Sequence, residues 1–346
     1  MKSICFLRRN WSATGGAENY LQRLSERIPS TQFEISLICE SWNGGNHPFA
    51  AVHHMPSRGP LPFAQAANQF LSDHRFDCVF SLERGIKSDI YRAGDGVHRA
   101  WLQHRSKGKP LQGWFRNQFN QKNHHTLDLE RTTFHPQNTQ HIIANSEMVL
   151  DDIHSYFDFP EERIHLIPNG VDYEKFSSGD RNAGRREMGW GPEDFVCLLV
   201  GAGTERKGHA LARKAVARLG SKMRLAIIDS PPPCTLPDLY AAADLFFLPT
   251  LYDPFANVTL EAMAAGLPVI TTEQNGAKMV IRSGENGFII RHASAIDDAT
   301  AYLIALCDSA VRQRIAAEGQ QSAAKCDIQT HLNKTIDLID QACSSN

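Results

Sequence analysis

Short apolar runs recur along the 346 residues of the chain, and the segments between them repeat apolar residues at helical spacing. Apolar runs bounded by Gly, Pro or polar clusters are typical of buried strands. The spacing of Leu21, Leu24 and Ile28 is typical of a helix with one buried face. Strands that alternate with helices indicate an α/β protein built on parallel sheets. We predict strands at residues 2–7, 34–39, 77–82, 141–145, 163–167, 195–200, 223–228, 244–248, 269–271 and 284–290.

The same pattern predicts two domains, which the length also allows at about 100–200 residues per domain. A strand is followed by the turn Pro168-Asn169-Gly170 and then by a polar segment at 177–186, which indicates a boundary near residue 170. The Gly-, Pro- and His-rich segment 44–62 is predicted as loop. Helices are expected at 17–28, 127–134, 147–157, 237–243, 257–265, 293–325 and 328–342, with one more beginning at residue 209.

Residues 249–285 contain most of the groups suited to binding a ligand. Asp253 lies in a loop after a buried strand, and Glu261 lies eight residues later inside a short helix. Both carboxylates are therefore expected near the carboxyl ends of the strands, where open α/β sheets bind ligands. The helix begins with backbone N–H groups that form an anion site, those of Asn257, Val258 and Thr259. Two carboxylates beside a site for a diphosphate indicate a sugar nucleotide.

This stretch resembles the donor-binding motif of the retaining glycosyltransferases with the GT-B fold, in particular glycosyltransferase family 4. That family carries Glu, seven residues and Glu, and then a run Glu-Ala-Met/Leu-Ala-x-Gly-x-Pro-Val-Ile. Here Asp253 and Glu261 take the two acid positions, and Ala-Met-Ala-Ala-Gly-Leu-Pro-Val-Ile follows Glu261. The resemblance covers most of the chain, strongly over 249–290 and weakly over 1–130.

The resemblance implies an α/β fold of the GT-B type, in which two Rossmann-like domains face each other across a cleft. Residues 1–170 would form the acceptor domain, joined by the C-terminal helix 328–346 that crosses back to it. Residues 171–327 would form the donor domain, which binds the nucleotide sugar. The short segment 230–236 stands where relatives often have a longer stretch, so this domain is expected to be trimmed.

Two further loops resemble the donor site of the family. Gly15-Gly16 follows the first strand and resembles the segment that approaches the donor diphosphate and the acceptor, although an ordinary tight turn is an alternative. Arg206-Lys207 precedes a helix and matches the family's diphosphate grip; cations at a helix N-terminus are unfavourable without an anion. The implied donor-binding residues are Gly15, Gly16, Arg206, Lys207, Asp253, Phe255, Ala256, Asn257, Val258 and Glu261.

Asp95 lies between Gly94 and Gly96 at the end of an extended run, a position suited to a cleft or to a turn. The segment resembles one in the lipopolysaccharide core glucosyltransferases of family 4, where an Asp lies on the acceptor side. Many relatives have a His nearby, and His98 is a second candidate. The resemblance therefore implies the catalytic residues Asp95, Asp253, Arg206 and Lys207.

Residues 97–127 contain no acid and combine basic with aromatic side chains. Basic residues for anionic headgroups and Trp for the interface are typical of a membrane-surface segment. A solvated basic face and an acceptor phosphate site are alternatives. The membrane or acceptor residues are Arg99, Trp101, Arg105, Lys107, Lys109, Trp114 and Arg116.

Composition restricts the remaining options. The net charge of −2 argues against nucleic acid as a partner. The eight cysteines form no Cys-x-x-Cys pair, and Cys39, Cys78 and Cys197 lie in apolar runs, which predicts buried thiols in a reducing cytosol. No apolar run is long enough to span a membrane, and we expect a cytoplasmic protein peripheral to the inner face of the plasma membrane. There is no Asp-x-Asp, so a metal-independent reaction without a cofactor is expected.

The leading hypothesis is a retaining glycosyltransferase that moves a hexose or heptose from a nucleotide sugar, with a UDP-sugar expected, to a lipopolysaccharide-core or similar lipid-borne saccharide. Departures from the family concern the sugar pocket: Asp253 replaces Glu, Ala256 replaces Gly, and Lys278-Met279 replaces Pro-Glu. The alternatives are a family 4 enzyme for capsule, exopolysaccharide or glycolipid, a hydrolase or epimerase, and a non-catalytic protein that binds sugar nucleotides and docks on membranes.

Overall fold

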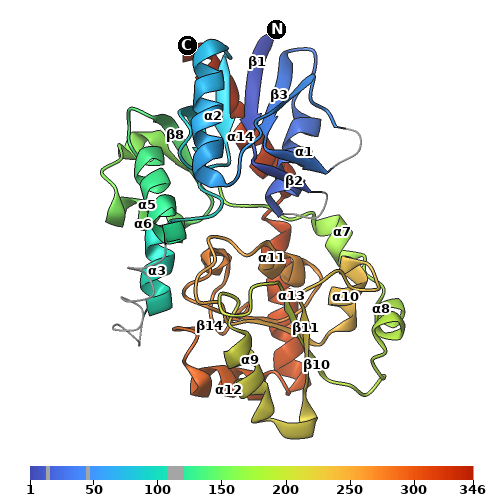
Figure 1. Cartoon of the computed structure of the whole chain (residues 1–346). Helices are drawn as coiled ribbons and strands as arrows, with labels where there is room; N and C mark the ends of the chain where they lie inside the picture. Colours follow the sequence, from blue (N-terminus) through green and yellow to red (C-terminus); the bar gives the residue numbers. More distant parts are fainter. Residues whose placement is uncertain (13–15, 44–46, 107–120, 346) are drawn as a thin grey trace. The chain divides into compact units, whose positions relative to one another are not determined.

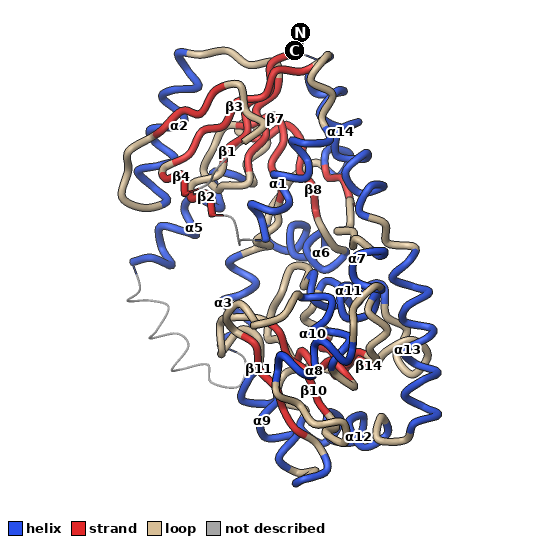
Figure 2. Tube along the Cα trace, turned by 90° about the vertical axis from the view of Figure 1, so that its right-hand side faces the viewer, coloured by secondary structure: helices blue, strands red, loops and turns tan. Residues whose placement is uncertain are grey.

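The computed structural model describes residues 1–12, 16–43, 47–106 and 121–345 of the chain. It divides into two compact units (Figure 1). Unit 1 comprises Met1–Pro168 and His331–Asn346, and unit 2 comprises Asn169–Thr330. Each unit has its own parallel sheet, and helices flank the strands of each unit (Figure 2). In these described residues, no helix is both long and apolar enough to cross a membrane.

The sheet of unit 1 has seven parallel strands in the order β5-β3-β1-β6-β7-β8-β9. Its interior strand β1, which pairs with β3 and β6, is buried from Ile4 to Leu7, as expected for a continuous apolar run covered on both faces. A separate parallel pair joins β2 to β4. The strands are β1 (Lys2–Leu7), β2 (Asn10–Ser12), β3 (Phe33–Cys39), β4 (Ser41–Asn43), β5 (Ala51–His54), β6 (Cys78–Ser81), β7 (Ser88–Arg92), β8 (Thr139–Ala144) and β9 (Ile164–Leu166).

Helices cover this sheet. Phe63 and Ala67 of α2 form one core with Leu7 of β1, and Leu129 of α5 joins the same cluster. The C-terminal helix α14 belongs to unit 1 from His331 onward and is fastened to β1 by an ion pair of 2.7 Å between Lys2 and Asp340. The helices are α1 (Gly16–Arg27), α2 (Pro60–Asp73), α3 (His98–Ser106), α5 (Gln121–Thr133), α6 (Glu147–Tyr156) and α14 (Ile328–Ser345).

The sheet of unit 2 has five parallel strands in the order β11-β10-β12-β13-β14. Its middle strand β12 is completely buried, whereas every residue of the edge strand β11 is partly exposed. The strands are β10 (Val196–Val200), β11 (Arg224–Ile228), β12 (Leu245–Leu248), β13 (Val269–Thr272) and β14 (Phe288–Ile290). The helices are α7 (Tyr173–Ser177), α8 (Arg181–Met188), α9 (His209–Ala217), α10 (Leu236–Ala242), α11 (Asn257–Ala264), α12 (Ile296–Ala305) and α13 (Ser309–Ala324), with a 3-10 helix η3 at Gly276–Val280.

One local prediction was wrong. The segment 44–62, predicted as loop, contains β5, which pairs in parallel with β3 from Ser36 to Cys39, and also the first turn of α2. The polar segment 177–186 contains most of α8, whose N-terminus is capped by Asp180. This helix is polar because it buries little more than Gly184 and Arg185. The prediction that Cys39, Cys78 and Cys197 are buried is confirmed.

Candidate active site

In unit 2 the loop that carries Arg206 and Lys207 is fastened to the end of β12. The carbonyl oxygen of Arg206 accepts hydrogen bonds from the backbone N–H of Leu251 (2.8 Å) and from the hydroxyl of Thr250 (2.7 Å). Gly208, which follows, has a φ of +74°, and a Cβ at this residue would lie 1.8 Å from the carbonyl oxygen of Pro249. Only glycine fits there, so the sequence Arg-Lys-Gly places both cations beside the loop after β12.

The ammonium group of Lys207 lies 2.8 Å from the carboxylate of Asp253, and the two residues are only 8% and 5% exposed. The guanidinium of Arg206 lies 3.9 Å from the same carboxylate and is partly exposed. Burial alone would raise the pKa of Asp253, but the charges of Lys207 and then Arg206 outweigh it and hold the pKa below its ordinary value. Two cations therefore surround one carboxylate, which leaves a positive charge that an anionic ligand would neutralise.

A second hydrogen-bond system fixes the loop of Asp253. Its backbone N–H donates to Gln274 and its carbonyl accepts from Gly276, both at 2.8 Å. Between these two residues lies Asn275, which is completely buried. The side-chain oxygen of Asn275 accepts from the N–H groups of Ala256 (3.2 Å) and Ala277 (3.0 Å), and its nitrogen donates to the hydroxyls of Thr259 (3.0 Å) and Thr271 (2.9 Å).

Asn275 thus uses its full capacity of two donors and two acceptor sites to join the Asp253 loop, β13 and α11. The role of Asn275 was not predicted from the sequence. Its signal was the Asn-Gly pair directly after a predicted strand, which marks a turn but not the partners of the side chain.

The N-terminus of α11 differs in part from expectation. Asn257 is exposed and Val258 is partly exposed, so their backbone N–H groups remain candidates for an anion. The N–H of Thr259, however, donates to the carbonyl of Ala256 at 2.9 Å and is already used. The side chains of Phe255 and Ala256 are buried in the core of unit 2, so only their backbone is suited to a ligand.

Glu261 lies in the second turn of α11. Its carboxylate accepts a hydrogen bond of 2.8 Å from the hydroxyl of Tyr240, and Glu261 itself is half-buried. Burial of Tyr240, followed by the charge of Glu261, raises the pKa of this tyrosine well above 10. The hydroxyl therefore stays protonated and holds the carboxylate in one orientation.

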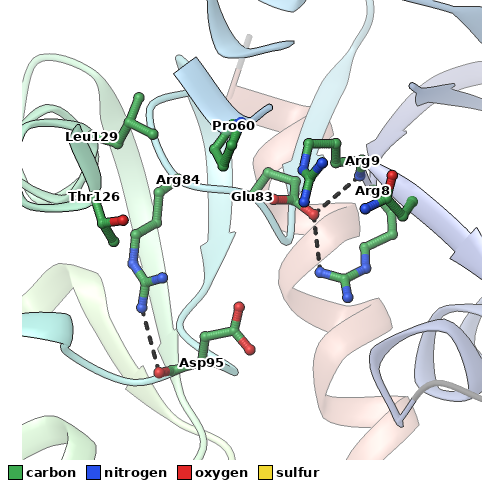
Figure 3. Close-up of a pocket in the computed structure, with 9 residues that line it drawn as sticks. Arg8, Arg9, Pro60, Glu83, Arg84, Asp95, Thr126 and Leu129 are labelled. Carbon is green, nitrogen blue, oxygen red and sulfur yellow. Dashed lines mark hydrogen bonds and ion pairs between the residues drawn. The ribbon is translucent and has the colours of Figure 1, made fainter. Parts of the chain in front are cut away.

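Unit 1 contains a pocket of about 260 Å³ (Figure 3). Arg84 lies on one side and Arg8 and Arg9 on the other, with Asp95 between them (Figure 3). Asp95 follows β7 and is exposed, and its loop is held by Arg84, which donates to the carbonyl of Gly96 at 2.7 Å. The lining residues are Arg8, Arg9, Asn10, Pro60, Glu83, Arg84, Asp95, Thr126 and Leu129.

His98, the alternative to Asp95, is not among the lining residues. Its backbone N–H donates to Glu130, and its Nε2 is buried without a hydrogen-bond partner. Burial, and then the charge of Arg84, lowers the pKa of His98 to about 4, so the ring is neutral at physiological pH. The geometry therefore favours Asp95 over His98 as the group that meets a ligand in this pocket.

The remaining candidates are Gly15, Gly16 and the basic and aromatic residues from Arg99 onward. Gly16 begins α1, and Gly15 lies outside the described residues. On α3 the guanidinium of Arg99 lies 5.3 Å from the ring of Tyr156, and that of Arg105 lies 5.7 Å from the ring of Trp101. Four members of the predicted membrane segment, Lys107, Lys109, Trp114 and Arg116, lie outside the described residues.

Comparison with known proteins defines the class. Two family models match the chain: Glycosyltransferase Family 4 over residues 14–175 and Glycosyl transferases group 1 over residues 187–308. Together with the two parallel-sheet units, these matches assign the chain to the glycosyltransferases of the GT-B fold, with domains of family 4 and group 1. The family and the fold class predicted from the sequence are confirmed.

The individual relatives share only limited sequence identity with the chain. The D-inositol 3-phosphate glycosyltransferase of Rhodococcus opacus is 26% identical over 217 residues, which cover 53% of this chain and 49% of the relative. The chain spans about half the length of the curated relatives it matches. Among solved structures, WaaG, a glycosyltransferase involved in lipopolysaccharide biosynthesis, superimposes with a TM-score of 0.82 at 20% identity and covers 97% of this chain and 99% of its own. HepE of Anabaena, solved in complex with UDP and glucose, gives 0.72 at 18% identity and covers 99% and 100%. At these identities the structures show the shared fold.

Proposed function

We propose that the chain transfers a hexosyl or heptosyl group from a UDP-sugar to a saccharide acceptor on a lipid, with retention at the anomeric carbon and without a metal ion. One observation carries the proposal: the buried pair Lys207–Asp253, with Arg206 3.9 Å away at the surface of the same unit. Its surplus of positive charge suits the diphosphate of a nucleotide sugar.

In this proposal Arg206, Lys207 and the N–H groups of Asn257 and Val258 bind the diphosphate. Because these groups are fixed before the reaction, they stabilise the charge that develops on the departing diphosphate. Glu261, oriented by its hydrogen bond to a tyrosine, accepts hydrogen bonds from the ribose.

Asp253 would accept hydrogen bonds from the donor sugar, since its low pKa keeps it charged. A retaining reaction then follows if the acceptor hydroxyl attacks the anomeric carbon on the face from which the diphosphate leaves. The leaving phosphate takes the proton of that hydroxyl. Asp95 would orient the acceptor in unit 1.

The lipid-borne acceptor is supported by two observations. The exposed basic residue Arg99 and the pair Arg105–Trp101 share the helix α3, a combination of basic and aromatic side chains that suits a membrane-facing segment. WaaG, which has the same fold, is involved in lipopolysaccharide biosynthesis. We therefore propose a lipopolysaccharide-core or similar saccharide as the acceptor, at the inner face of the plasma membrane.

Thermal stabilisation by UDP, GDP, ADP and their sugar conjugates tests this function. We expect selective stabilisation by UDP and UDP-sugars that is lost in Glu261→Ala and kept in Glu285→Ala, a change of an exposed acid elsewhere in unit 2. Transfer to a lipid-linked saccharide in the presence of EDTA, with an axial product from an axial donor, would complete the test. A folded protein that no nucleotide stabilises contradicts the proposal and favours a membrane-docking protein without transferase activity.

A further inference from the structure

The pocket of unit 1 contains three arginines, but each is already paired with a carboxylate. The pairs are Arg8 with Glu83 (2.9 Å) and Glu18 (3.2 Å), Arg9 with Glu40 (2.9 Å), and Arg84 with Glu130 (3.6 Å). Glu130 is completely buried and Glu18 nearly so, so these pairs are parts of the fold rather than surface contacts.

Among these groups of the described residues, carboxylates therefore outnumber guanidiniums. The lining carries three guanidiniums and two carboxylates, those of Glu83 and Asp95. Three further carboxylates outside the lining, those of Glu18, Glu40 and Glu130, pair with the same arginines. The pKa of Glu83 is consistent with this balance. Burial raises this pKa, and the charge of Asp95 adds to the increase, which outweighs the lowering by Arg8 and Arg9. His98 supplies no charge, because its ring is neutral at physiological pH.

This balance decides what the pocket binds. A phosphate carries about −1.5 to −2 charges and is mainly a hydrogen-bond acceptor. It would have to approach the carboxylates of Asp95 and Glu83, and the charge of each lining guanidinium is already shared with a carboxylate. A sugar hydroxyl both donates and accepts. It can donate to a carboxylate and accept from an N–H of an arginine without breaking the ion pairs between the arginines and the glutamates.

We propose that this pocket binds an uncharged sugar ring through hydroxyl groups that donate to Asp95 and Glu83, and that it disfavours phosphorylated sugars. One oxygen of Glu83 is held by the guanidinium of Arg8 (2.9 Å) and the N–H of Arg9 (3.0 Å), which fixes the direction of its carboxylate. Pro60 and Leu129 supply apolar contacts for the C–H faces of a ring (Figure 3).

The volume agrees with one ring. At about 260 Å³ the pocket is smaller than the roughly 300–1,000 Å³ of sites that enclose drug-sized ligands. The inference rests on the proposed function only in one respect, namely that the bound sugar belongs to the acceptor. Binding itself needs no nucleotide, so it can be tested without the donor site.

Saturation-transfer NMR on the whole protein without nucleotide provides the test. The neutral probes are the methyl α-glycosides of glucose, galactose, mannose and glycero-manno-heptose, together with myo-inositol. The phosphorylated probes are the corresponding 6-phosphates (7-phosphate for the heptoside) and inositol 3-phosphate. We expect at least one neutral probe to bind and to bind more tightly than its phosphorylated counterpart.

Charge-removing variants complete the design. Asp95→Asn, at an exposed residue that leaves the fold intact, is expected to weaken the neutral probe about tenfold and to improve the phosphorylated one. Glu83→Gln is expected to act in the same direction. Asp128→Asn, which removes an equal charge from the exposed Asp128–Arg131 pair on α5, is expected to change neither affinity.

The proposal is overturned if no neutral probe binds, if a phosphorylated probe binds more tightly than its neutral counterpart, or if Asp95→Asn leaves all affinities unchanged. These results are independent of nucleotide binding. A protein that fails to bind UDP but binds a neutral glycoside contradicts the proposed transferase function and leaves the assignment of this pocket in place.

Discussion

Replacing Lys207 by methionine tests whether the Lys207–Asp253 pair has the free energy of a buried ion pair or that of a surface ion pair. The substitution keeps the length of the side chain and leaves Asp253, 5% exposed, without the cation 2.8 Å away. Removing one partner of a buried pair costs about 3–5 kcal/mol, whereas an exposed pair contributes about 0–1 kcal/mol. Arg206 offsets part of this cost, but at 3.9 Å and with its side chain 45% exposed it interacts more weakly.

Chemical denaturation of the wild type, Lys207→Met, Asp253→Asn and the double variant measures this cost. We expect Lys207→Met to lose about 3 kcal/mol or more at pH 7. The double variant should lose less than the sum of the single losses, by about 1–3 kcal/mol, because it buries no unpaired charge. Additive losses, or a loss below about 1 kcal/mol in Lys207→Met, would show that the pair is not buried as described.

The pH dependence follows from the same pair. The pKa of Asp253 is below its ordinary value in the native protein, so its contribution to stability is complete above pH of about 3.9 and is lost as the pH falls through the lower native value. In Lys207→Met burial acts without the main opposing charge, which raises the pKa of Asp253. As the pH falls, this carboxylate is protonated, which removes the unpaired buried charge and reduces the destabilisation of the variant. The difference in stability between the two proteins should therefore be largest near pH 7 and narrow toward pH 4.

Three further predictions concern other parts of the fold. Gly208→Ala is expected to prevent folding of unit 2 or to destabilise it by several kcal/mol, since its Cβ would meet a carbonyl oxygen at 1.8 Å. Gly203→Ala, with a φ of +91° and no atom within 4 Å, should cost about 1 kcal/mol. Equal midpoints of the two variants in thermal melts would contradict this contrast. Asn275→Leu leaves buried hydroxyl and N–H groups unpaired and should cost about 2–4 kcal/mol and weaken nucleotide binding, whereas Asn275→Asp, which keeps both acceptor contacts, should cost less in urea denaturation. Burial, and then the charge of Arg92, lowers the pKa of His331 from 6.5 to about 4. Its contribution to stability is therefore present above pH 6.5 and is lost between pH 6.5 and 4. NMR should show this imidazole titrating near 4, and a midpoint near 6.5 would be inconsistent with its burial.

The alternation of apolar runs and helical segments predicted most strands and helices of both sheets. It succeeded because parallel strands buried on both faces are continuous apolar runs, as in the runs that became β1 and β12. It failed at β5, where the residues Ala51–His54 are only half-buried and His-rich, so their pairing with β3 left no apolar signature.

The candidate site was predictable where a local motif carries the chemistry. Arg206-Lys207-Gly208 and the spacing of Asp253 and Glu261 are visible in the sequence, and the structure places Lys207 beside Asp253. The role of Asn275 was not predictable, because its four partners come from separate segments that only the folded sheet assembles. The charge balance of the unit 1 pocket likewise depends on pairs such as Arg9–Glu40, which are 31 residues apart.

The central claim is that the cations of the loop before α9 bind the diphosphate of a donor. Calorimetric titration of UDP and of uridine tests it most directly, using the wild type, Arg206→Ala and Arg282→Ala; both arginines are exposed in unit 2, and Arg282 is paired only locally with Glu285. We predict that the wild type prefers UDP strongly over uridine, that Arg206→Ala reduces this preference about tenfold or more, and that Arg282→Ala leaves it unchanged. Equal affinities for UDP and uridine, or a preference that survives in Arg206→Ala, would contradict the account.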